Sequence, residues 1–74
     1  MQLSDQRVHH KLVRVEAAPS RRWAVSIAHR PQAEFFGDRE LALTYAQILA
    51  SVNRPCAVQV YGTSGTLEHE WMFG

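Results

Sequence analysis

The sequence predicts an α+β fold, a two-layer sandwich of one helix on an antiparallel sheet, with its elements in the chain order βββαββ. Apolar residues alternate with polar or small ones before residue 37 and after residue 55, and this two-residue period is typical of half-buried strands. Residues 39–52 instead carry apolar side chains three and four positions apart, which is the period of a helix. One helix of this length covers one face of a sheet, so we expect the other face to be partly open.

The first two strands are expected to form a hairpin. Residues 8–16 are rich in β-branched valine and predict the first strand. Pro19 and Ser20 favour a turn, because proline presets its backbone angle and serine can bond the local backbone. Residues 23–28 alternate again, and we expect the face with Trp23 to be buried. The opposite face carries only small side chains, namely Ala24, Ser26 and Ala28.

A third short strand and the helix follow. Residues 33–36 are bulky and too few for a helix, so they predict a strand. Asp38 can accept hydrogen bonds from the first free amides of a helix that begins at Arg39, and Pro55 cannot continue that helix. The apolar stripe predicted to face the sheet comprises Leu41, Tyr45, Ile48, Leu49 and Val52, with Ala42 and Ala46 beside them.

The last two strands are expected to form a second hairpin. Residues 56–61 and 66–72 alternate, and the glycines within residues 62–65 suit a tight turn because glycine adopts positive φ. Alternation places Leu67, His69 and Trp71 on one face of the last strand and Glu68 and Glu70 on the other. The predicted core comprises Val13, Val15, Trp23, Val25, Ile27, Phe36, Leu41, Tyr45, Ile48, Leu49, Val58, Val60 and Leu67.

Length and charge limit the classes of function. The 74 residues suffice for one small domain, which we place at residues 8–74 after a flexible N-terminus at residues 1–7. The net charge of +1 is too small to indicate nucleic acid or a membrane surface as a partner. Residues 7–30 carry six basic side chains and one acid, a net +5, whereas residues 31–74 carry two basic side chains and five acids, a net −3. This split predicts either two complementary patches or mixed surface charge after folding.

Cysteine content and hydropathy predict a cytoplasmic protein. Cys56 is the only cysteine, so no internal disulfide can form and a reducing compartment is expected. No apolar run approaches the roughly 18 residues of a membrane span. Residues 1–6 lack the apolar core of a signal peptide. We therefore expect no membrane association.

Several short motifs together resemble a bacterial family. They are the Trp-Ala-Val of residues 23–25, Phe36, Ala42 and Ala46 four apart, Val-Gln-Val-Tyr-Gly at 58–62, Gly-Thr-Leu at 65–67 and Gly74. In their order and intervals, over most of residues 8–74, they resemble the proteins grouped as domain of unknown function 2188. The resemblance implies a small α+β fold and supplies no catalytic residues. Members often carry basic residues around the final hairpin, where this chain has Thr63, Ser64, Thr66, Glu68 and Glu70.

The residues that could support catalysis or bind metal lack the required spacing. His9 and His10 are adjacent and point to opposite strand faces, and His29 and His69 are far apart in the chain. A folded site from His69, Cys56 and one of the first two histidines stays conceivable. Cys56 follows proline at the start of a strand, where a small buried hydrophobe belongs. We expect no enzyme activity, no cofactor and no metal site.

Two kinds of binding surface compete as functional interpretations. The terminal apolar residues Trp71, Met72 and Phe73 are expected to pack either on their own domain or on a partner subunit. The leading hypothesis is therefore a small interaction or regulatory module that associates with itself through a strand edge or the open sheet face. The alternative is a nucleic-acid-binding module. Its candidate contacts are Lys11, Arg14, Arg21, Arg22 and Arg30, centred on the Arg-rich first hairpin.

Overall fold

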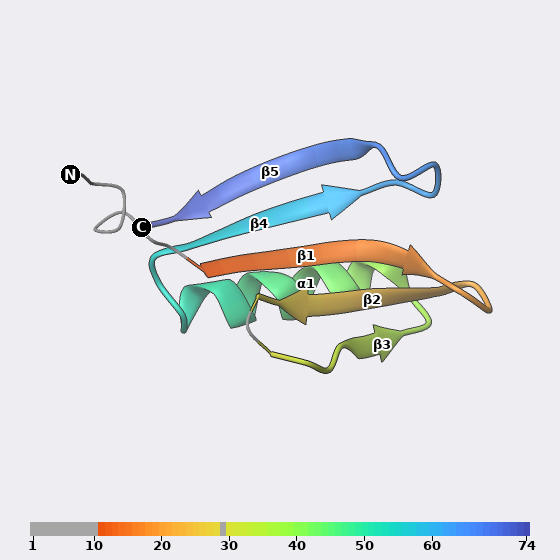
Figure 1. Cartoon of the computed structure of the whole chain (residues 1–74), viewed down its shortest axis with the longest axis horizontal. Helices are drawn as coiled ribbons and strands as arrows, with labels where there is room; N and C mark the ends of the chain where they lie inside the picture. Colours follow the sequence, from red (N-terminus) through yellow and green to blue (C-terminus); the bar gives the residue numbers. More distant parts are fainter. Residues whose placement is uncertain (1–10, 29) are drawn as a thin grey trace.

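The computed structural model describes residues 11–28 and 30–74, and in this part of the chain one helix lies on one face of a five-stranded sheet (Figure 1). The elements are β1 (Lys11–Ala18), β2 (Arg22–Ile27), β3 (Glu34–Phe36), α1 (Arg39–Ser51), β4 (Cys56–Tyr61) and β5 (Leu67–Phe73). The α+β class with a single helix and one open sheet face is confirmed. The flexible N-terminus expected at residues 1–7, and residues 8–10 of the first expected strand, lie outside the described residues.

The sheet is mixed, so the expectation of an antiparallel sheet is wrong at one pair of strands. The spatial order is β3-β2-β1-β4-β5, and β1 pairs with β4 in parallel while the other neighbours are antiparallel. The cause is the helix. Because β3 runs in the same direction as β1, and α1 returns the chain to the end where β1 starts, β4 enters the sheet parallel to β1 (Figure 1). Alternation of residues within a strand does not indicate the direction of its neighbour.

The core lies between α1 and the valines of the three central strands. Its fully buried sheet residues include Val13, Val15, Val25, Val58 and Val60. Trp23, Phe36, Tyr45 and Leu49 are partly buried and pack against this core, as does Leu43. These strand positions follow the predicted alternation.

The helix face that meets the sheet is rotated from the predicted one: it is centred on alanines and keeps only Tyr45 and Leu49 of the five large residues predicted. Its buried residues are Ala42, Ala46 and Ala50, four positions apart. Ile48 lies two residues beyond Ala46, about 200° around the helix, and is 57% exposed. Leu41, Val52 and Leu67 are exposed as well, so the predicted core was wrong at Leu41, Ile48 and Leu67. Alanine brings the helix backbone close to a sheet face whose valines already fill the core.

A bulge changes the faces of β5. Val60 pairs with His69, but Tyr61 pairs with Leu67, so Glu68 is an extra residue in the ladder. Glu68 reaches the side chain of Arg39 at the start of α1, with 3.1 Å between Arg39 Nη2 and Glu68 Oε1. The expectation that Leu67 shares a face with His69 and Trp71, and Glu68 with Glu70, is therefore wrong.

The bulge also explains one glycine. A Cβ atom at residue 62 would collide with the carboxylate of Glu68, so only glycine lets that side chain cross the end of β4. Away from the bulge the ladder is regular, from Val60 opposite His69 to Cys56 opposite Phe73.

Candidate functional site

The open face of the sheet carries a polar network centred on Arg14. The Arg14 guanidinium lies over the Tyr61 ring, 5.2 Å from its centroid, and its Nε is 3.4 Å from Glu16 Oε2. The Tyr61 hydroxyl donates a 2.9 Å hydrogen bond to Gln59 Oε1, and Gln59 Nε2 donates a 2.9 Å bond to Glu70 Oε2. A hydrogen bond between the side chains of Arg14 and Tyr61, and secondly the negative charge of Glu16, raise the pKa of Arg14 above its ordinary value. The network therefore ties β1, β4 and β5 together and fixes a permanent positive charge on this face.

A second arginine and aromatic pair lies toward the β3 edge. The Arg22 guanidinium lies 4.6 Å from the centroid of the Phe35 ring, which is half exposed. Ala24 pairs with Phe35 across β2 and β3, and its small side chain leaves the ring accessible. Arg21 lies in the neighbouring turn, where its φ of 59° is in the left-handed region. Three of the predicted nucleic-acid contacts thus lie on or beside the open face.

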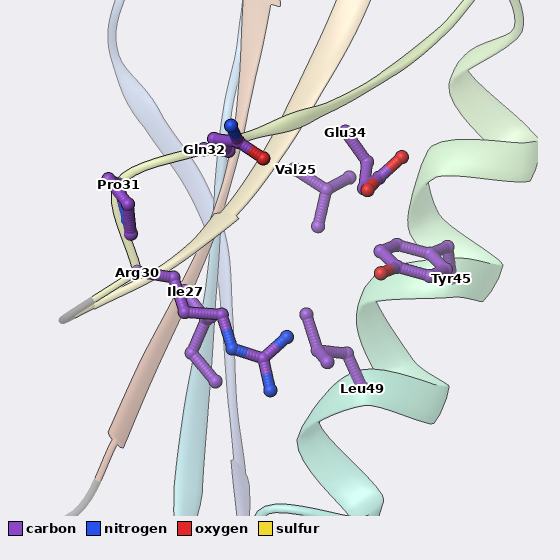
Figure 2. Close-up of a pocket in the computed structure, with 8 residues that line it drawn as sticks. All are labelled: Val25, Ile27, Arg30, Pro31, Gln32, Glu34, Tyr45 and Leu49. Atoms are coloured by element: carbon purple, nitrogen blue, oxygen red, sulfur yellow. The ribbon is translucent and has the colours of Figure 1, made fainter.

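The other two predicted contacts lie elsewhere. Lys11 pairs with Cys56 at the opposite end of β1. Arg30 lines a hollow of about 170 Å³ between α1 and the segment that leads to β3. Figure 2 shows its guanidinium pointing toward Leu49, while the carboxylate of Glu34 points toward Tyr45. The hollow is smaller than the roughly 300–1,000 Å³ of small-molecule sites. The five cations therefore do not form a single surface.

The three residues predicted for self-association lie at the end of β5 and have different surroundings. Phe73 is partly buried against the core, with the Arg54 guanidinium 6.0 Å from its ring centroid. Trp71 is 38% exposed and stacks on His69, with centroids 5.7 Å apart and an interplanar angle of 4°. Met72 is 57% exposed and pairs with Ala57 on the open face. Phe73 thus packs on its own domain, whereas Trp71 and Met72 present apolar surface to solvent.

The outer edge of β5 is long and unpaired in the described part of the chain. β5 has seven residues, and six of them, residues 67–72, are exposed. The edge at the other side of the sheet, β3, has only three residues. The helix packs over β1, β2, β3 and β4, so β5 extends the sheet beyond the helical layer (Figure 1). A strand of this kind presents backbone N–H and C=O groups to any strand that pairs with it.

The remaining residues considered for catalysis or metal binding do not form a site within the described part of the chain. Cys56 is buried, and burial raises the pKa of its thiol, which disfavours the nucleophilic thiolate. Residues 11–28 and 30–74 contain no group of three metal-ligating side chains, while His9, His10 and His29 lie outside the described residues. The bulge turns the carboxylates of Glu68 and Glu70 to different partners.

Sequence reasoning missed four residues that shape these surfaces, namely Phe35, Gln59, Tyr61 and Glu70 in its role as a partner of Gln59. Alternation alone places Gln59 and Tyr61 on one face of β4. Only the parallel pairing of β1 with β4 shows that this face is shared with Arg14.

In the part of the chain that the structure describes, no helix is both long enough and apolar enough to cross a membrane. Comparison with family models, with curated proteins and with solved structures found no match to this chain.

Proposed function

We propose that this chain is a small, non-enzymatic interaction module that binds a second copy of itself through the outer edge of β5. The observation that carries the proposal is a seven-residue edge strand that presents Trp71 and Met72 to solvent. Pairing of two such edges satisfies the backbone groups of both strands and buries apolar side chains.

The acids of β5 do not protect this edge in the usual way. Charged side chains commonly block an edge strand when they project freely from it. Here Glu68 is paired with Arg39, and Glu70 accepts a hydrogen bond from Gln59. Both carboxylates are held by their own chain, which leaves the edge open to another strand.

Small size favours association as well. A chain of 74 residues has a free energy of unfolding of about 4–11 kcal/mol. Association with a second copy adds stability that rises with protein concentration, because only the folded chain can form the dimer. We therefore expect the thermal midpoint of this protein to increase with its concentration.

Light scattering tests the proposal directly. We expect a mass of twice 8.4 kDa for the wild type, and a monomer for Trp71→Lys, which places a charge at the new interface. Ile48→Lys is the matched control, because it changes an exposed apolar residue on the far side of α1. A monomeric wild type at high concentration, or equal disruption by both variants, contradicts the proposal.

Nucleic-acid binding is a second candidate, favoured by the two arginine and aromatic pairs on the open face. Arginine can contact phosphates while Phe35 offers a ring on which a base can stack. Glu16 and Glu70 on the same face reduce its positive charge, so this candidate ranks second. The test is anisotropy of a labelled single-stranded oligonucleotide across a salt series. Salt-sensitive binding that is lost in a variant with Arg21→Glu and Arg22→Glu, without change in oligomer mass, would favour it.

The proposed module acts without a catalytic residue, a metal or another cofactor. A single buried cysteine is compatible with a reducing, cytoplasmic environment. The resemblance to the domain of unknown function 2188 proteins stays a prediction.

A further inference from the structure

We infer that two copies of β5 pair in antiparallel fashion with Trp71 opposite the partner's Trp71. This inference rests on the proposed function, because it specifies the register of the same strand edge. Two independent features of β5 select this register: its bulge and its charges.

The bulge limits the length of strand that can pair regularly. The extra residue Glu68 interrupts the ladder near the start of β5, whereas residues 69–73 pair one to one with β4. A bulge bends its strand and increases the local twist, which disfavours a further strand at that point. The regular segment has Trp71 at its middle, so a two-fold axis through Trp71 pairs the whole of it.

The charges and the bulge exclude the neighbouring registers. A two-fold axis normal to the sheet places the helix-side faces of both copies on the same side of the joined sheet. Residues that lie directly opposite each other project to the same face, so residues 69, 71 and 73 can oppose only residues 69, 71 and 73 of the partner. Centring the pair on Glu70 places two carboxylates directly opposite each other. Centring it on His69 sets residues 70–73 opposite the bulged start of the partner's β5, where the ladder is irregular. Centring it on Trp71 places Glu70 opposite the partner's Met72, with no like charges opposed.

Length excludes the register centred on Met72, because only residues 71–73 of β5 would then pair. The register centred on Trp71 pairs five residues and sets His69 opposite the partner's Phe73. Aromatic side chains opposite one another in a sheet stabilise the pair. The stacked His69 and Trp71 rings already lie parallel in a single chain, with an interplanar angle of 4°. The dimer would thus carry a continuous row of aromatic side chains. This row lies on the helix-side face of the sheet, where β5 extends past α1.

Disulfide trapping tests the register. The variants Glu70→Cys and Met72→Cys are made separately with Cys56→Ala, and each is oxidised with oxidised glutathione alone and after mixing with the other. Directly opposite residues have Cβ atoms about 4.5–5.5 Å apart, close enough for a disulfide after a small adjustment. We expect a covalent dimer in the mixture and only monomer from either variant alone. Light scattering of the reduced samples shows whether each variant still associates.

Each other outcome overturns the inference. A covalent dimer from Glu70→Cys alone shows the register centred on Glu70, and one from Met72→Cys alone shows the register centred on Met72. If the reduced variants are dimeric and no disulfide forms in any sample, the copies pair through another register or surface. A monomeric wild type refutes the proposed function itself, so the two failures are distinguished.

Discussion

Replacing Ala46 with leucine tests whether the alanine face of α1 sets the distance between helix and sheet. Ala46 is fully buried, with Ala42 and Ala50 one turn to either side. Leucine adds three carbon atoms at a position that faces the buried valines. Overpacking of this kind costs about 1–3 kcal/mol. Leucine and alanine both favour helices, so little of the change comes from helix propensity.

Ile48→Ala is the reciprocal change on the other side of the helix. It removes three carbon atoms from a side chain that is 57% exposed. We expect a change within about 0.5 kcal/mol, as for surface substitutions, because alanine's better helix propensity offsets the lost contact. If Ile48 were a core residue, as the sequence alone predicted, the same substitution would cost about 2–5 kcal/mol.

Urea unfolding followed by far-ultraviolet circular dichroism measures both changes. A domain of this size has an m-value of about 1 kcal/mol/M in urea, so a loss of about 2 kcal/mol lowers the midpoint by about 2 M. We expect that shift for Ala46→Leu and almost none for Ile48→Ala. The reverse pattern, with Ile48→Ala losing 2 M and Ala46→Leu unchanged, would refute the assignment of the buried helix face. All variants are compared at one protein concentration, because association adds to stability.

Three further predictions concern the helix cap, a turn and the thiol. Asp38→Ala removes the carboxylate that accepts a 3.3 Å hydrogen bond from the Glu40 amide, and should lower the free energy of unfolding by about 1 kcal/mol in the same urea assay. Gly65 has a φ of +84° and no atom near a new Cβ, so Gly65→Ala should cost about 1 kcal/mol from backbone conformation alone, with an unchanged m-value. Burial raises the pKa of Cys56 above its ordinary value of 9.0, so the folded state holds the thiol proton more tightly. This contribution to stability is complete below pH 9 and decreases as the pH rises beyond it; urea midpoints between pH 7 and pH 10 should fall less for Cys56→Ala than for the wild type.

Local sequence patterns were sufficient to predict the helix and the strands, but not how these elements pack and pair with one another. The N-cap at Asp38 and the alternation around Val13 and Val58 depend on neighbours in the chain, and the structure follows them. Which face of α1 becomes buried does not depend on the apolar pattern of the helix alone. Large residues at Leu41 and Ile48 form a stripe as regular as that of the alanines, and only the closeness of the sheet selects the smaller side chains. The bulge at Glu68 is equally non-local, because its side chain lies against Gly62, just after β4, and pairs with Arg39 at the start of α1.

The candidate surfaces were less predictable, because each depends on which strands become neighbours. The arginines of the first hairpin are visible in the sequence, but the contact of Arg14 with Tyr61 requires β4 to lie beside β1. The same pairing determines the edge strands. Once α1 returns the chain and β4 occupies the free side of β1, the hairpin that follows can only place β5 outermost. The terminal apolar residues therefore reach an open edge through the direction of the helix crossover, which no residue of β5 itself specifies.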